Sequence, residues 1–395
     1  MHTSIRWICV IFILGALVCC DSGNGGDGGN GGDGGNGGNG DSSVTEDSGT
    51  EQLAEAEASR LPDADNYLDV WRRVPRLEKA VQPVIEMLEY GDVLKVSDRL
   101  VAIAGLVAAR FWDAKVLFSR RAEEAQRQGI GEEIITAIGH YDDPDLKSNQ
   151  EQVAYQFAIE MHTAGQSSEA TYQSVVAETT ESGAIELATL VGFHTLQAIT
   201  ERAFQLTQPE GSKHSLPAVE GEWIVDLSAG SENPNAREET LGTPWSPKAW
   251  GGAAPDLSNS TLGLGAYVLT ATGLETRLLE FTIMIPARHW NAKVEWFAHA
   301  SSARDEGVAD DVIRAIGRRE VPTFSRSDEE AIYLLGTELF DTHRVTDATF
   351  DNALEVLGEE SVIDVLSVMG YYSMVASVLA NAKYVAPVDT DEFPP

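Results

Sequence analysis

The chain has 395 residues, of which 28 are Lys or Arg and 62 are Asp or Glu, so its formal charge at pH 7 is -34. A protein this acidic is repelled by phosphate backbones and by anionic lipid headgroups, which excludes nucleic acid as a partner. The length suffices for two domains of ordinary size, each with its own core. We interpret the acidic excess as a heavily solvated surface and not as an acidic binding function.

The first twenty residues predict export and lipid attachment. Arg6 precedes an apolar run, residues 7–18, which is too short to span a bilayer and fits the hydrophobic region of a signal peptide. The run ends in Cys19 and Cys20 and resembles the lipobox of bacterial lipoproteins, where the chain is cleaved before a diacylated cysteine. Cys20 is the better candidate, because Cys19 then fills the small-residue position before the cut. We therefore expect a lipoprotein of the bacterial cell envelope, anchored to a membrane and facing the periplasm or the cell surface.

The segment that follows, residues 21–60, predicts a flexible tether. It begins with Gly, Asn and Asp almost exclusively and continues as a polar, acidic stretch. Such a composition cannot bury enough apolar surface to order itself, and a random coil of this length reaches roughly 35 Å. The third cysteine, Cys9, would be removed with the signal peptide, so no disulfide is expected.

The rest of the chain contains one sequence twice. Arg277 follows Arg99 by 178 residues, and at this offset residues 99–139 share 15 identities in 41 pairs with residues 277–317. Trp112 with Trp290 and Gly129 with Gly307 are among the identical pairs. We predict a first domain at 61–206, a Pro- and Gly-rich linker at 207–254 and a second domain at 255–395.

Both copies show helical spacing and the same punctuation. Pro286 is expected to end or kink an apolar helix over 278–285, and Asn291, like Asp113 in the first copy, to cap the next helix. Gly129 and Gly307 suit left-handed positions after a helix. Ser327 with Glu330, like Asn149 with Gln152, has the spacing of a capping box, and a long helix is expected over 359–383. Alternating patterns are weak, at 222–226 and 266–270. We predict an all-α fold of two similar bundles.

The copies differ in residues that can carry acid–base chemistry. The first copy has Ala102, Leu117 and Arg121 where the second has three ionisable residues, Glu280, Glu295 and His299. Only the second copy therefore looks equipped for proton transfer.

The second copy resembles a known family. Residues 287–299, ARHWNAKVEWFAH, with Gly307, Ile313, residues 342–345 and residues 370–372, resemble the carboxymuconolactone decarboxylase and AhpD-like (alkylhydroperoxidase-like) family. The resemblance covers nearly all of the second copy, and the first copy resembles the family only through the duplication. It implies an all-helical fold and symmetric oligomers, so the fused copies are expected to form a pseudo-dimer, and several chains a homo-oligomer of pseudo-dimers.

One branch of the family resembles thiol peroxidases with a Cys-x-x-Cys-x-x-x-His motif. Aligning its His with His299 puts the two cysteines at Ala292 and Glu295, so neither is present. Because a peroxidatic cycle needs a thiolate and a resolving thiol, AhpD-type peroxidase (peroxiredoxin) activity is not expected.

The decarboxylase branch resembles this chain in its Glu-x-x-x-His helix. Glu295 and His299 are four residues apart, so they share a helix face, and the Glu295 anion at the helix start is expected to orient His299 by a hydrogen bond. Glu280 is a candidate second acid or base. Further candidates for binding a small-molecule substrate are Arg288, His289, His343 and Tyr372.

Structural interpretations stand beside each of these. Glu295 with His299 also fits a solvated helical pair, His343 fits a cap that complements the helix dipole, and Arg288 has Arg110 as its counterpart, which favours a structural role. The tryptophans fit core positions. No ligand spacing signals a metal site, and we expect no cofactor. A non-catalytic envelope protein that uses the fold for binding remains the alternative to an enzyme.

Overall fold

The computed structural model describes residues 59–90, 94–225, 250 and 254–381. Within these ranges the secondary structure consists of helices without strands, which confirms the predicted all-α class. The weak alternating pattern at 266–270 lies inside a helix, because its apolar residues also fit one helical face. The helices of the first half are α2 Tyr67–Trp71, α3 Pro75–Tyr90, α4 Asp98–Phe111, α5 Lys115–Arg127, α6 Glu132–Gly139, α7 Asn149–Ala164, α8 Glu169–Glu178 and α9 Glu181–Ala203. Those of the second half are α11 Pro255–Thr270, α12 Thr276–His289, α13 Lys293–Asp305, α14 Asp310–Gly317, α15 Ser327–Thr342, α16 Asp347–Leu357 and α17 Glu359–Asn381.

Helix boundaries repeat along the chain. Both ends of α12, α13, α14, α15 and α17 lie 178 residues after those of α4, α5, α6, α7 and α9. The left-handed backbone positions repeat as well: Gly129 with Gly307, as expected, and Gly165 with His343. The similarity in sequence therefore extends to where each helix begins and ends.

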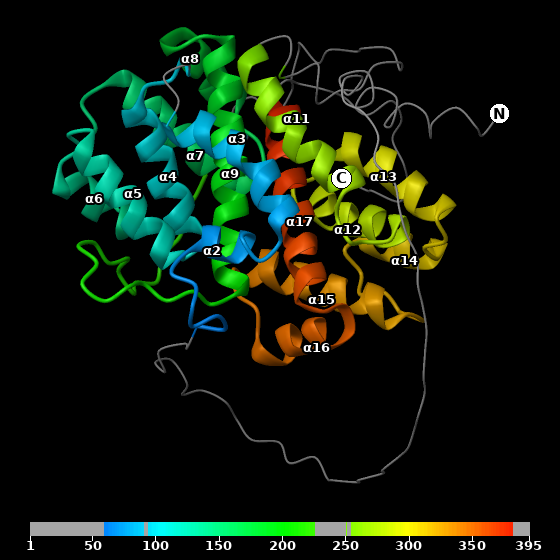
Figure 1. Cartoon of the computed structure of the whole chain (residues 1–395). Coiled ribbons are helices and arrows are strands. Elements are labelled where there is room, and N and C mark those ends of the chain that lie inside the picture. The colour runs from blue at the N-terminus through cyan, green and yellow to red at the C-terminus, as the bar shows by residue number, and fades with distance from the viewer. Residues whose placement is uncertain (1–58, 91–93, 226–249, 251–253, 382–395) are drawn as a thin grey trace, which may run out of the picture.

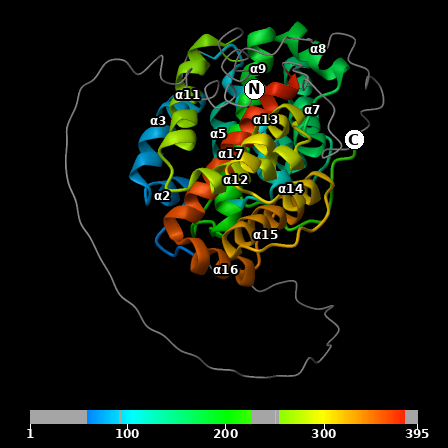
Figure 2. The same cartoon turned by 90° about the vertical axis from the view of Figure 1, so that its right-hand side faces the viewer.

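Two long helices, α9 and α17, lie side by side through the middle of the molecule (Figures 1 and 2). Helices α4 to α8 lie on one side of this pair and α12 to α14 on the other, while α3 packs against α11. A Cβ added to Gly192 of α9 would lie 2.2 Å from Met374 Cα, and one added to Gly370 of α17 would lie 2.3 Å from Leu196 Cδ1. Since Gly370 and Met374 are the counterparts of Gly192 and Leu196, the two halves make the same close contact reciprocally.

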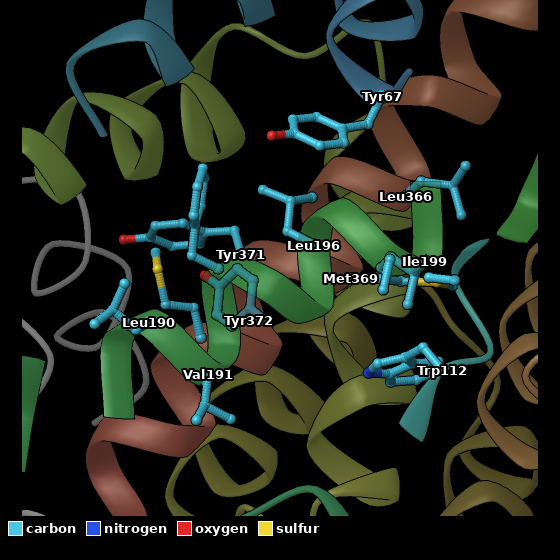
Figure 3. Packing of buried hydrophobic residues seen from close by; sticks show 14 of the residues in the cluster. Tyr67, Trp112, Leu190, Val191, Leu196, Ile199, Leu366, Met369, Tyr371 and Tyr372 are labelled. Atoms are coloured by element: carbon cyan, nitrogen blue, oxygen red, sulfur yellow. The ribbon is translucent and has the colours of Figure 1, made fainter. Parts of the chain in front are cut away.

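The core is continuous between the halves. Buried apolar side chains of both halves form one cluster, and Figure 3 shows members from α9 and α17 packed along the central pair. The rings of Trp112 and its counterpart Trp290 meet edge to face at 6.4 Å. Trp112 and Trp296 are fully buried, as their prediction as core residues requires, while Trp290 is partly buried. Residues 214–225 of the predicted linker lie on the first half, where Trp223 Nε1 donates to the hydroxyl of Tyr155 at 3.1 Å.

Three details of the helix punctuation differ from the sequence prediction. Pro286 lies inside α12 and does not end it, since a proline in the last turn removes one backbone bond while the helix continues to His289. Asn291 and Asp113 do not cap the following helices, because each adopts a left-handed conformation in the turn, with φ values of 53° and 52°. Their side chains instead accept hydrogen bonds from Arg288 and Arg110, at 2.6 and 2.9 Å.

The predicted capping boxes are also absent. Ser327 and Asn149 are the first residues of α15 and α7, and neither helix has a side-chain hydrogen bond from its N-cap residue. The N-cap residues are Arg326 and Ser148. In both helices the N-cap residue therefore lies one position earlier than the capping box requires. An error of one residue is usual when helix ends are predicted from sequence. The long helix expected over 359–383 is α17, which is described to Asn381.

Candidate active site

The second half joins Glu280 to His299. Glu280 lies on α12 and His299 on α13, and the left-handed turn at Asn291 folds the two helices against each other. His299 Nδ1 lies 2.7 Å from Glu280 Oε2, and the two side chains are only 11% and 14% exposed. When Glu280 is ionised, its carboxylate accepts a hydrogen bond from Nδ1–H of His299. Nε2 is then the ring nitrogen that can exchange a proton with a ligand.

Tyr372 of α17 completes this group. Its ring meets the His299 ring edge to face, with centroids 4.9 Å apart. Tyr372 is among the core residues labelled in Figure 3 and is only 5% exposed. Of the residues singled out from the sequence, Glu280, His299 and Tyr372 are therefore the three that the fold brings together.

Glu295 does not perform the role predicted for it. It lies in the first turn of α13 and is 3% exposed, but neither carboxylate oxygen has a hydrogen-bond partner among the described residues, so it does not orient His299. Burial raises its pKa well above the usual range and favours the neutral acid. The expected stabilisation of an anion by the helix dipole is too weak to offset this desolvation. Glu295 is also one cause, after burial, of the raised pKa of Tyr371.

Arg288 and His289 lie at a different place in the second half. Both line a cavity of about 100 Å³ that also includes Phe340 and Arg319. The ring of His289 stacks on Phe340 at 4.7 Å, and burial, followed by Arg319 and His343, lowers its pKa to about 3. Arg288 donates to the Gly317 carbonyl at 2.6 Å, and burial with Arg319 lowers its pKa to about 10.

The role of Arg288 is shared between the halves. Its counterpart Arg110 donates to the carbonyl of Gly139, the counterpart of Gly317, at 3.2 Å. The same contact therefore ties α4 to the end of α6 and α12 to the end of α14, which supports the structural interpretation of Arg288.

His343 packs against the first half. Its ring lies 4.5 Å from that of Phe111 and 4.6 Å from that of Trp112. Burial, with Arg202 next, lowers its pKa to about 4, so the ring is neutral near pH 7. It occupies the left-handed position after α15 but does not complement the helix dipole with a charge, because desolvation removes that charge.

The first half has a charged pair that the sequence did not reveal. Arg121, the counterpart of His299, pairs with Glu89 of α3 at 2.6 Å, and their side chains are 6% and 5% exposed. Tyr67 and Gln197 also donate to Glu89. The first half therefore also has a buried ionisable pair, because α3, which lies outside the aligned region, supplies the carboxylate of Glu89. The sequence signal that could have indicated this pair was Arg121, an arginine at a position that the helical pattern predicts to be buried.

The two members of this pair shift each other's pKa. Burial tends to raise the pKa of Glu89, but Arg121 and Arg120 more than reverse this, and the pKa is lowered. Burial tends to lower the pKa of Arg121, and Glu89 likewise reverses the direction. Both groups are therefore charged near neutral pH.

Further questions concern the predicted lipidation site, metal binding and membrane spans. Cys20 and the other two cysteines precede residue 59. Across the ranges 59–90, 94–225 and 254–381, no group of His, Asp or Glu is arranged to hold a metal ion. One helix in these ranges, α17, is long and apolar enough to cross a membrane, but its apolar window is 100% buried inside the protein.

Comparisons with known proteins do not place the chain in a family. No family model, no curated protein and no solved structure matches it.

Proposed function

We propose that this protein is a lipid-anchored, tandemly duplicated relative of the carboxymuconolactone decarboxylase and AhpD-like family, and that its second half transfers protons on a small organic acid. His299 is the acid–base residue and Glu280 orients it. The first half serves as scaffold for this chemistry. The 2.7 Å contact between His299 Nδ1 and Glu280 Oε2 carries the proposal.

The surroundings of the pair favour acid–base chemistry over a solvated helical pair. Both side chains are largely withdrawn from water, and the carboxylate comes from a neighbouring helix, so the pair is fixed by tertiary packing. A positioned imidazole can remove a proton beside a carboxylate, or deliver one to the carbon that a departing CO₂ leaves. The Tyr372 ring packs edge to face on the His299 ring and helps to fix the orientation of the imidazole. Thiol chemistry is disfavoured, because Ala292 and Glu295 occupy the positions of the peroxidase cysteines.

The tandem arrangement supports a built-in pseudo-dimer. Helix boundaries repeat at one offset, and the close approach at Gly192 is mirrored at Gly370. Reciprocal contacts of this kind are expected of an isologous interface. The domain limits 61–206, 207–254 and 255–395 remain a prediction.

Activity is tested with the full chain on unsaturated lactones and β-keto acids. Loss of lactone absorbance and release of CO₂ report turnover. His299→Gln is expected to lower kcat/KM by about 10²–10⁴-fold, the usual contribution of a general acid or base. Glu280→Gln is expected to lower it less and to change the pH profile, because the imidazole loses its orienting anion.

The matched control is His140→Gln, which replaces an exposed histidine of the first half. It should turn over substrate as the parent protein does. Equal turnover by the parent and His299→Gln would contradict the assigned roles.

Lipid attachment is tested by feeding bacteria a labelled fatty acid. The parent chain and Cys9→Ala should be labelled and found with membranes, while Cys20→Ala should lose the label. A Cys20→Ala variant that keeps the label would refute attachment at Cys20.

One observation favours the alternative, a non-catalytic envelope protein that binds a ligand or partner. Three cavities in the described part of the chain, lined respectively by residues that include Arg121, His289 and Tyr155, do not have Glu280, Glu295 or His299 in their linings. This alternative predicts no turnover of any member of the panel, with a partner recovered from membranes by affinity capture.

A further inference from the structure

A cavity of about 180 Å³ lies in the first half, beside the Glu89–Arg121 pair. It is bounded by the end of α3, the start of α4 and the middle of α5. Arg121 occupies the alignment position of His299, so the cavity lies in the first half's version of the proposed active-site region. Its lining includes Glu89 of α3, Asp98 of α4 and five charged residues of α5.

Around Glu89 the cavity lining has an excess of positive charge. Glu89 faces two arginines: Arg121 at 2.6 Å and Arg120 at 3.7 Å. A single carboxylate neutralises only one guanidinium, so this cluster has one excess positive charge. The side chains of Glu89 and Arg121 are almost fully withdrawn from water, while that of Arg120 is 30% exposed, so solvent screens the excess charge only in part.

Two donors in this cluster have no acceptor. Arg120 Nη1 and Arg121 Nε are buried and have no hydrogen-bond partner among the described residues. An unsatisfied buried donor is unfavourable, and one beside a charge is more so. An oxyanion held in the cavity, which both arginines line, would meet two guanidinium groups and would neutralise the excess charge.

Linked differences between the halves make room for these arginines. A Cβ on Gly105 of α4 would lie 2.6 Å from Arg121 Cδ, so the long side chain crosses α4 where there is no side chain to meet it. The second half has Ile283 at the position of Gly105 and Ala298 at the position of Arg120. The arginine cluster is therefore a built feature of the first half.

The outer lining restricts the charge of the occupant. Asp98 and Glu123 line the cavity, and Glu124 is paired with Arg127 at 2.7 Å. These carboxylates, and the overall charge of -34, repel anions that carry more than one negative charge. An ion with one negative charge matches the excess at Arg120 and Arg121.

We propose that Arg120 and Arg121 bind a small monocarboxylate in this cavity. The planar carboxylate suits the guanidinium fork of Arg120, while its second oxygen accepts from Arg121. The site lies in the first half and does not depend on catalysis at Glu280 and His299.

Calorimetric titration of the full chain with sodium propionate at constant ionic strength tests this proposal. The parent protein should show saturable one-to-one binding. Arg120→Gln should weaken it at least about tenfold, because the carboxylate loses a charged partner. Arg120→Lys keeps the charge without the fork and should give an intermediate affinity.

Two control variants separate the site from general charge effects. Arg72→Gln removes an exposed guanidinium that is paired with Asp69 and lies outside the cavity lining, and it should change the affinity by less than about twofold. His299→Gln removes the proposed catalytic base and should leave propionate binding unchanged, which separates this proposal from the proposed function. Circular dichroism of each variant verifies that it is folded.

Competing anions provide the remaining outcomes. Inorganic phosphate at pH 8, a dianion, should bind at least about tenfold more weakly than propionate. Tighter binding of phosphate, equal affinity of the parent and Arg120→Gln, or no saturable binding of propionate by the parent would each overturn the proposal.

Discussion

In the first half an Arg–Glu ion pair joins α3 to α5, whereas in the second half a His–Glu hydrogen bond joins α12 to α13. Arg121 and His299 hold the same position in the repeat, but their carboxylates come from different helices. The longer arginine side chain crosses α4 at Gly105 to reach Glu89, while the shorter imidazole meets Glu280 on the adjacent helix. Because Ala102 stands where the second half has Glu280, and Tyr267 stands where the first half has Glu89, the placement of the carboxylate decides the partner on a shared backbone.

A second exchange of carboxylates follows the same principle. In the first half Glu201 of α9 accepts from the backbone N–H groups of Val116 and Leu117, each at 2.8 Å, at the start of α5. In the second half Leu379 replaces Glu201, and the carboxyl lies at Glu295 in the position of Leu117. A buried carboxyl adjoins the helix start in both halves, but only Glu201 has hydrogen-bond partners among the described residues. Glu201 therefore has a structural role at the start of α5, whereas Glu295 has no hydrogen-bond partner among the described residues at the start of α13.

Removing the carboxylate of the first-half pair should have the largest effect. Glu89→Ala leaves Arg121 buried without its counter-ion and should lower the free energy of unfolding by about 3–5 kcal/mol. Glu280→Ala should cost about 1–2 kcal/mol, since His299 can remain neutral. Urea denaturation measures both changes. Equal losses would mean that the two pairs contribute alike, contrary to the comparison drawn above.

The shared central contact should be nearly as sensitive. Gly192→Ala places a Cβ 2.2 Å from the backbone of Met374, and the two central helices must move apart. We expect a loss of about 3 kcal/mol in the free energy of unfolding, measured by urea denaturation. Gly263→Ala in α11 is the control, because its nearest atom is 4.0 Å away and the change should be neutral or slightly stabilising. A tolerated Gly192→Ala would argue against close packing of α9 on α17.

Exchanging Glu295 for its counterpart should stabilise the protein. Burial raises the pKa of Glu295 in the folded protein. The contribution of this group to the free energy of unfolding is therefore complete below its pKa in the unfolded chain, and it is lost as the pH rises toward its pKa in the folded protein. Glu295→Leu should therefore raise the free energy of unfolding by about 2 kcal/mol at pH 8, and by less at pH 4. Denaturation at the two pH values measures the difference. A loss of stability at pH 8 would indicate that the carboxyl has a partner that stabilises it.

The remaining effect concerns acid stability and is absent near pH 7. Burial, with His343 next, lowers the pKa of His162 to about 3. Between this value and about pH 6.5, His162 is therefore protonated in the unfolded chain and neutral in the folded protein. Stability from this group is complete above about pH 6.5 and falls with the pH toward 3, by about 1.4 kcal/mol per unit. His162→Phe, which introduces the residue found at Phe340, should remove this slope. Melting curves between pH 7 and pH 4 test it, and the exposed His140→Gln should retain the slope.

Periodicity in the sequence predicted much of the fold. The constant offset and the glycines at 129 and 307 predicted helices whose boundaries the structure repeats, because such patterns depend on local backbone preference. Helix ends were predicted less well. Asn291 and Asp113 have the chemistry of caps, but a left-handed turn and an arginine partner determine their role.

Residue types alone predicted an all-helical, duplicated protein in which only the second copy has the Glu280, Glu295 and His299 set. Tertiary structure decided which of those residues meet. It joined Glu280 to His299 across two helices, left Glu295 buried without a partner and paired Arg121 with Glu89. The reason is physical: helical spacing is set by neighbours along the chain, whereas the partner and the pKa of a buried charge depend on distance and desolvation, which packing of distant segments sets.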